Sequence, residues 1–176
     1  MNNCAFPEDQ RRSYKHSGNN QPYENLAAGL VQRLLQLTNI IVKDIERAAQ
    51  KWAELLGIET PEVHLNHLEG NENYLYHAKR VSCDLKVCNI DMGHFVIELH
   101  EPAGGESSFQ EFLDQHGNGV HHIGFEVGDK RDAIIEDLKK AGYDTDRTVG
   151  IYPGSSWTIV DSEDVLGVNL NIKPVR

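Results

Sequence analysis

The sequence contains no apolar run long enough to span a bilayer, and its first residues lack the apolar segment of a signal peptide. We therefore expect a cytoplasmic protein. The sequence is also short of basic residues, because 17 Lys and Arg stand against 27 Asp and Glu, for a net charge of −10. Since nucleic acids and anionic membranes both bind basic surfaces, neither is expected as a partner.

Cysteine is scarce, and its placement argues against a structural disulfide. The three residues are Cys4, Cys83 and Cys88, and no two of them form a Cys-x-x-Cys pair. Cys83 and Cys88 lie at odd spacing on one predicted strand, so their side chains face opposite sides and cannot bridge to each other there. Reduced thiols in a cytoplasmic protein are the simplest interpretation.

Apolar residues, in contrast, are frequent enough for a core, at 39% of the 176 residues. This length predicts one domain or two tightly fused small modules. The first 22 residues are polar and rich in turn formers, which predicts an N-terminal extension over 1–34. Within it, apolar residues at helical spacing predict a helix over 23–34. The alternative is that this stretch runs directly into the first strand.

Helix-capping residues mark two similar helices. Asp44 is expected to cap a helix that ends at Gly57, and Asp129 to cap a second one that ends at Gly142. Apolar residues at strand spacing predict the strands. These are expected over 35–42, 62–68, 81–90, 94–100, 120–127, 143–149, 156–161 and 167–173.

A third, shorter helix is predicted between the two halves. Ser108 and Glu111 have the spacing of a capping box, apolar residues form a stripe behind them, and Gly117 follows as the stop. We expect this segment, residues 103–117, to link two larger units.

The order of elements repeats along the chain. Asp44 falls on Asp129, and Gly57 on Gly142, at one shift of 85 residues (129 − 44). Each copy has the order strand, helix, three strands, and two independent segments rarely agree in both caps and stops. The sequence thus predicts duplicated βαβββ modules, at 35–102 and 118–176. The expected fold is α+β, a curved, cup-shaped mixed sheet with its helices on the convex side.

Strand parity then selects the residues of the concave side. On each repeated strand the apolar set should pack under the helices, and the alternate residues should line the cup. The best functional signal is the strand at 120–127 with its neighbour at 94–100. Together they present Glu98, His100, His122 and Glu126 on the side opposite their packed faces.

The duplicated unit resembles the vicinal oxygen chelate superfamily, and most closely its branch of methylmalonyl-CoA epimerases and glyoxalase-like proteins. The resemblance covers about residues 35–174. It rests on four stretches, which are Ile41 to Ala49, Ile97 to Pro102, the helix from Phe109 to His116, and His121 to Val127.

The resemblance implies a divalent metal held by one side chain from each of four strands. The matching positions here are Leu37, Glu98, His122 and Asn171. Leu37 cannot bind a metal, so the implied ligands are Glu98, His122 and Asn171. Their nitrogen and oxygen donors would suit Mn²⁺, Co²⁺, Ni²⁺, Zn²⁺ or Mg²⁺, with water in the open positions.

The implied chemistry is that of a lyase or isomerase that forms an enolate from a small 2-oxo or acyl-thioester substrate. Its base is expected to be Glu98 or Glu126, the acids of the concave face, although Glu98 cannot easily be both a ligand and a free base. A solvated polar face is the simpler interpretation of His100 and Glu126.

Leu37 and Asn171 favour a different class, a metal-free protein of the bleomycin-resistance kind that binds a small molecule. Because a cup leaves exposed strand edges, we also expect a homodimer in which the N-terminal segment covers part of the partner or of its own sheet.

Overall fold

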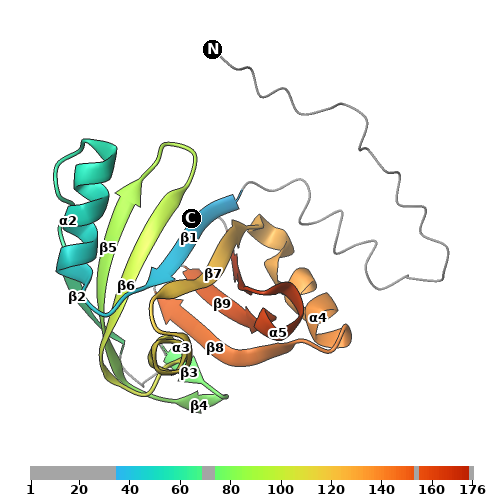
Figure 1. The fold of residues 1–176 in the computed structure, drawn as a ribbon. Coiled ribbons are helices and arrows are strands. Elements are labelled where there is room, and N and C mark those ends of the chain that lie inside the picture. Colours follow the sequence, from blue (N-terminus) through green and yellow to red (C-terminus); the bar gives the residue numbers. More distant parts are fainter. Residues whose placement is uncertain (1–34, 69–73, 153–154, 175–176) are drawn as a thin grey trace.

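We describe the fold from a computed structural model, which covers residues 35–68, 74–152 and 155–174 (Figure 1). The predicted helix over 23–34 and Cys4 lie outside this range. In chain order the elements are β1 (Leu35–Ile41), α2 (Ile45–Leu56), β2 (His64–Leu68), β3 (Tyr74–Tyr76), β4 (Lys79–Arg80), β5 (Cys83–Asp91), β6 (Val96–Gly105), α3 (Ser108–His116), β7 (Gly119–Glu126), the 3₁₀ turn η2 (Gly128–Lys130), α4 (Arg131–Lys140), β8 (Asp144–Tyr152), β9 (Ser155–Asp161), α5 (Glu163–Leu166) and β10 (Asn169–Lys173).

The strands of the described residues form one sheet in the order β2-β5-β6-β1-β7-β10-β9-β8-β3-β4. The first strands of the two repeats, β1 and β7, pair antiparallel at its centre, while β1 pairs with β6 and β7 with β10 in parallel. The sheet curls around a hollow, with α2 and α4 on its outer side (Figure 1). The predicted α+β fold with a curved mixed sheet is therefore confirmed.

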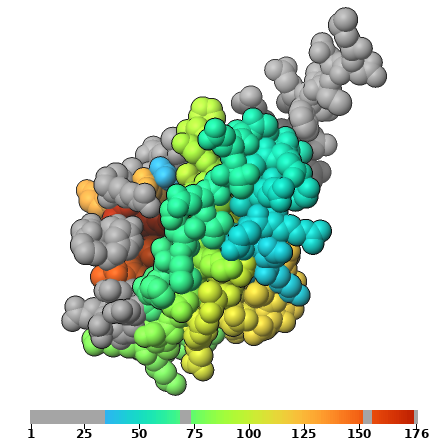
Figure 2. Space-filling model, turned by 90° about the vertical axis from the view of Figure 1, so that its left-hand side faces the viewer, coloured from blue at the N-terminus to red at the C-terminus, as the bar shows by residue number. Residues whose placement is uncertain are grey.

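Two apolar clusters attach the helices to the outer face of the sheet. One joins α2 to β5 and β6 through Ile45, Ala49 and Leu99, and the other joins α4 to β7 and β10 through Ile134 and Ile172. The predicted parity of the packed faces is confirmed by both clusters. Viewed from the side of α2, the surface is built mainly by the first module, and the orange and red parts of the second show at the left (Figure 2).

A third cluster lies on the inner side of the sheet, under α3. It contains Ile41, Tyr74, Leu85, Phe109 and Ile159, which come from both halves of the chain. The floor of the hollow is therefore a shared core that neither module could form alone.

The short hairpin β3–β4 was not predicted, and it changes how the halves are joined. It precedes β5 in the chain, yet Tyr74 and Tyr76 of β3 pair with Gly150 and Thr148 of β8. Three residues are too few to show a period of two, so the strand left no pattern in the sequence.

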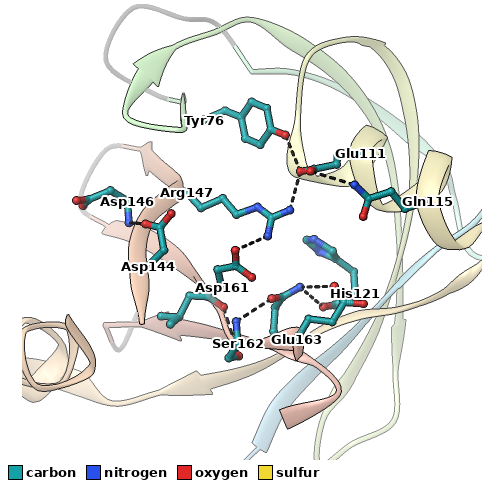
Figure 3. Close-up of polar contacts among 12 residues, drawn as sticks. Tyr76, Glu111, Gln115, His121, Asp144, Asp146, Arg147, Asp161, Ser162 and Glu163 are labelled. Carbon is teal, nitrogen blue, oxygen red and sulfur yellow. Dashed lines mark hydrogen bonds and ion pairs between the residues drawn. The ribbon is translucent and has the colours of Figure 1, made fainter. Parts of the chain in front are cut away.

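A polar network stabilises this pairing of β3 with β8 (Figure 3). The Tyr76 hydroxyl donates to Glu111 Oε2 at 2.6 Å. Arg147 donates to the same oxygen at 2.6 Å and to Asp161 Oδ2 at 2.5 Å. One guanidinium thus links β8 to α3 and β9, and through Glu111 to β3.

The helix caps agree with prediction in part. Asp44 accepts from Arg47 N at 3.0 Å, and Gly57 ends α2 in the left-handed region at φ 68°. The cap of α3 is Ser107, one residue before the predicted Ser108. The predicted cap by Asp129 is wrong, because that residue lies inside η2 and the N-cap of α4 is Lys130.

Cys83 and Cys88 are buried on opposite faces of β5, as predicted, because Cys83 belongs to the inner cluster and Cys88 to the outer one under α2. Among the described residues no helix is long and apolar enough to cross a membrane.

Candidate functional site

The hollow of the sheet contains a cavity of about 280 Å³. Its walls come from strands of both modules and from α3, so it lies where the repeats meet. The lining residues are Asn66, Leu68, Leu85, Val87, Asn89, Glu98, His100, Phe109, His122, Trp157, Ile159, Asn171 and Lys173.

Three of the residues singled out in the sequence, Glu98, His122 and Asn171, line this cavity together. They come from β6, β7 and β10, and the alternation of side chains along each strand turns them inward. Asn39 on β1 lies between Glu98 and His122 in the sheet, and its amide donates to the Glu98 carbonyl at 3.3 Å. The sequence pattern therefore located the wall of the cavity.

Two other positions of the expected site lie elsewhere. Leu37 is buried on β1 and packs over Gly124 of β7, where a Cβ would lie 2.5 Å from the leucine Cγ. Glu126 is half-buried and is not among the described residues that line the cavity.

A β-bulge sets the surroundings of His122. Asn39 pairs with His122, but the next residue of β1, Ile40, pairs with Val120, so His121 is the extra residue. By strand alternation alone, His121 should lie on the packed outer side. Instead its ring lies 5.2 Å from that of Phe109, on the inner side, and its Nδ1 lies 2.9 Å from His122 Nδ1.

The ring of His122 has a polar neighbour at each nitrogen. Nε2 lies 3.1 Å from Asn171 Nδ2, and Nδ1 lies 2.9 Å from His121 Nδ1. The orientation of the Asn171 amide decides which of the two ring nitrogens carries the proton. Burial, and after it the charges of His121, His100 and Lys173, holds the pKa of His122 well below its usual range.

A charged pair faces this histidine chain. Lys173 Nζ lies 3.8 Å from Glu98 Oε1, and His100 Nε2 lies 3.9 Å from Glu98 Oε2. Only 10% of the lysine side chain and 15% of the glutamate side chain are exposed. Burial, with Lys173 as the second cause, lowers the pKa of His100 to about 3, so the ring is neutral.

Two residues that line the cavity each carry a buried polar atom without a hydrogen-bond partner among the described residues. These atoms are Asn171 Oδ1 and His100 Nδ1. Buried polar atoms are nearly always paired, and a buried water is the usual partner of such an atom.

Part of the lining is apolar and aromatic. The Phe109 and Trp157 rings lie 6.2 Å apart, and Ile159 belongs to the same cluster. Trp157 lies close against β8 because residue 150 is glycine, where a Cβ would overlap the indole. The lining thus combines apolar and polar side chains, as small-molecule sites usually do.

Comparison with known proteins identifies the family. Residues 38–159, which are 122 of the 176 residues (159 − 38 + 1), match the model of the Glyoxalase/Bleomycin resistance protein/Dioxygenase superfamily. The chain belongs to this superfamily. Among curated proteins, none matches it significantly in sequence.

Solved structures share the fold. A hypothetical protein from Bacillus halodurans C-125 is 21% identical, with a TM-score of 0.57, over 82% of this chain and 95% of that one. A variant of the Streptomyces coelicolor methylmalonyl-CoA epimerase, in complex with 2-nitronate-propionyl-CoA, is 22% identical, with a TM-score of 0.54, over 80% and 93%. The Mycobacterium tuberculosis methylmalonyl-CoA epimerase is 21% identical, with a TM-score of 0.50, over 81% and 88%.

Many members of this superfamily bind a divalent metal, but the residues here fit one poorly. The position of Leu37 offers no donor atom, and His122 Nε2 already lies 3.1 Å from the Asn171 amide nitrogen. The carboxylate of Glu98 has an ammonium group 3.8 Å away, which would repel a dication. Among the described residues, no group of three or more His, Cys, Asp and Glu could hold a metal.

Strand parity placed His100 on the concave face, where it lines the cavity, but sequence reasoning gave Lys173 and Trp157 no role in the site. Lys173 shares the inward parity of Asn171, two residues before it, and this was its only signal in the sequence. His100 was assigned to a solvated face, but it is buried, because α3 covers the end of β6 and brings Phe109 to 5.3 Å from the imidazole.

Proposed function

We propose that the protein binds a small polar organic molecule in the cup, and that it does so without a divalent metal. The observation that supports this most directly is the cavity itself, which sets Glu98, His122 and Asn171 against Phe109 and Trp157. Its volume of about 280 Å³ suits a molecule, or part of one, of about a dozen heavy atoms.

The two tryptophans of the chain provide a test, because Trp157 lines the cavity and Trp52 packs in the cluster under α2. In a Trp52→Phe variant, emission from Trp157 should respond to those members of a library of small metabolites that bind. In a Trp157→Phe variant the same compounds should leave the emission of Trp52 unchanged. If no compound shifts the emission of the first variant, binding in the cup is contradicted.

The metal-free part is tested by elemental analysis of the purified protein. We expect well under one equivalent of Mn, Co, Ni, Zn or Mg per chain. A stoichiometric metal that is lost in His122→Ala would instead support the metal site of Glu98, His122 and Asn171.

A second candidate is an isomerase or lyase that acts through an enolate. Glu98 supports it, because a carboxylate that lies beside an ammonium group in a cavity can remove a proton next to a carbonyl that the ammonium polarises. The likeness to methylmalonyl-CoA epimerases supplies a substrate to try. Incubation of methylmalonyl-CoA in D₂O should then give deuterium at C2 by NMR, and Glu98→Gln should abolish it. A base at Glu126 would be supported if Glu126→Gln abolished it as well.

A further inference from the structure

Lys173 is the most enclosed of the lysines that the structure describes. Its side chain is 10% exposed, and the ammonium group makes no hydrogen bond with any residue in the described part of the chain. The carboxylate oxygen that pairs with it, Glu98 Oε1, lies 3.8 Å away, too far for a hydrogen bond. The ammonium group thus has an ionic partner but no hydrogen-bond acceptor among the described residues, so its three donors are available to a bound molecule.

The atoms around the ammonium group have the opposite character. The Glu98 carboxylate can only accept, and its Oε1 lies 3.8 Å from the ammonium nitrogen. A molecule that satisfies this wall needs an acceptor for Lys173 and, beside it, a donor for Glu98.

We infer that the Lys173 ammonium is the fixed positive charge of this cup, and that it binds the carbonyl oxygen of a small neutral hydroxycarbonyl compound. The hydroxyl of that compound faces Glu98, and its apolar substituent lies against Phe109 and Trp157. The ligand is neutral because Glu98 already balances the charge of Lys173, and a second carboxylate would lie close to Glu98. This inference rests on the proposed binding function and deepens it.

The same arrangement accounts for the poor fit to a metal. A dication held by Glu98 and His122 would share the cavity with a fixed positive charge. With Lys173 in place, a metal ligand at position 37 has no role, and Leu37 can pack over Gly124 instead.

The first experiment tests the role of Lys173 without any organic ligand. The starting variant combines Leu37→His with Asn171→Glu, which adds two metal donors. This variant, and two further variants that add one lysine substitution to it, are titrated with Ni²⁺ and Co²⁺ in a calorimeter. Adding Lys173→Met should tighten metal binding at least about tenfold, because it removes a like charge from a partly buried site. Adding Lys139→Met removes an equal charge from an exposed site on α4 and should change nothing. Equal affinity with and without the Lys173→Met substitution overturns the role of Lys173.

The second experiment uses the wild-type chain and single substitutions, which disturb folding less. Binding of 2-hydroxyacetophenone is measured by ligand-observed NMR, with acetophenone, which lacks the hydroxyl, and benzoate, which is charged, as matched probes. The hydroxyketone should bind wild type more tightly than either, and Lys173→Met should weaken it at least about tenfold. Lys139→Met is again the control.

Each other outcome is decisive. Tighter binding of benzoate, or undiminished binding to Lys173→Met, overturns the ligand class. Absence of binding by the hydroxyketone also overturns it, while the metal titration still decides the role of Lys173. If Trp157 responds to other compounds in that case, the proposed binding function stands and only the inference fails.

Discussion

Leu37 and Gly124 show how a single residue that cannot bind a metal fits into the centre of the sheet. They face each other across β1 and β7, and the leucine occupies the space that a side chain at position 124 would need. Gly124→Ala should therefore lower the free energy of unfolding by about 1–3 kcal/mol, measured by urea denaturation. In the background of Leu37→Ala the same substitution should cost much less. Additive losses would show that the two side chains do not compete for this space.

The buried histidines make the free energy of unfolding depend on pH. Burial lowers the pKa of His100 and of His121 to about 3, and holds that of His122 well below its usual range. The unfolded chain takes up protons near pH 6.5 and the folded chain does not, so stability is full above pH 6.5 and falls as the pH drops toward 3. Each such histidine contributes a slope of up to about 1.4 kcal/mol per pH unit.

Urea unfolding between about pH 7.5 and pH 5 measures this slope on either side of the unfolded pKa. His100→Gln should make it shallower, whereas the same change at the exposed His94 should leave it unaltered. A slope that His100→Gln does not change would mean that His100 is protonated in the folded protein.

Among the elements, α2 and α4 offer a matched pair of caps. Asp44 accepts the backbone N–H of Arg47, while Asp129 lies in η2 and α4 has no side-chain cap. Asp44→Ala should cost about 1 kcal/mol of stability, and Asp129→Ala less than about 0.5 kcal/mol, by chemical denaturation. Equal losses would indicate that Asp129 caps α4 in solution.

These helices also show what a sequence can predict of an element. The repeat placed both Asp residues in corresponding positions, and both helices exist, because the apolar stripes that pack them on the sheet recur. The cap of the second helix was missed because three residues after Val127 form a 3₁₀ turn first. A local turn of this kind depends on tertiary packing and leaves the apolar period unchanged.

The candidate site was predictable to the same extent. Alternation along regular strands gave the inward direction of Glu98, His122 and Asn171. The bulge at His121 breaks that alternation, and the burial of His100 depends on α3, so neither followed from the strand pattern. Lys173 had the right parity, but only the structure shows its ammonium group beside Glu98.

Arg147 joins the elements α3, β8 and β9, and its removal should lower the stability of the protein. Arg147 bonds Glu111 and Asp161, and its side chain is 20% exposed (Figure 3). Arg147→Met should cost about 3 kcal/mol or more, because it leaves two partly buried carboxylates without their partner. Lys139→Met, which breaks an exposed ion pair with Asp146, should cost less than about 0.5 kcal/mol in the same urea titration.

For the molecule as a whole, the edge strands of the sheet matter most. The order of strands leaves β2 at one end and β4 at the other, and Leu65 on β2 is 52% exposed. Exposed strand edges with apolar residues invite pairing or cover, and the apolar stripe between Leu26 and Leu35 is suited to provide it. The predicted homodimer, with the N-terminal segment over the partner or over its own sheet, follows from these two features together.

Light scattering coupled to gel filtration tests this assembly. At micromolar concentration the full chain should have about twice its mass of 19.8 kDa, and a chain that lacks residues 1–30 should shift toward the monomer. Leu65→Lys should weaken the dimer if β2 forms the interface, because a charge on an edge strand opposes pairing. The same change at Leu55, which is 76% exposed on α2, is the control for general effects of added charge. A monomer at every concentration, unaltered by the deletion, would instead mean that the edges of this sheet need no partner.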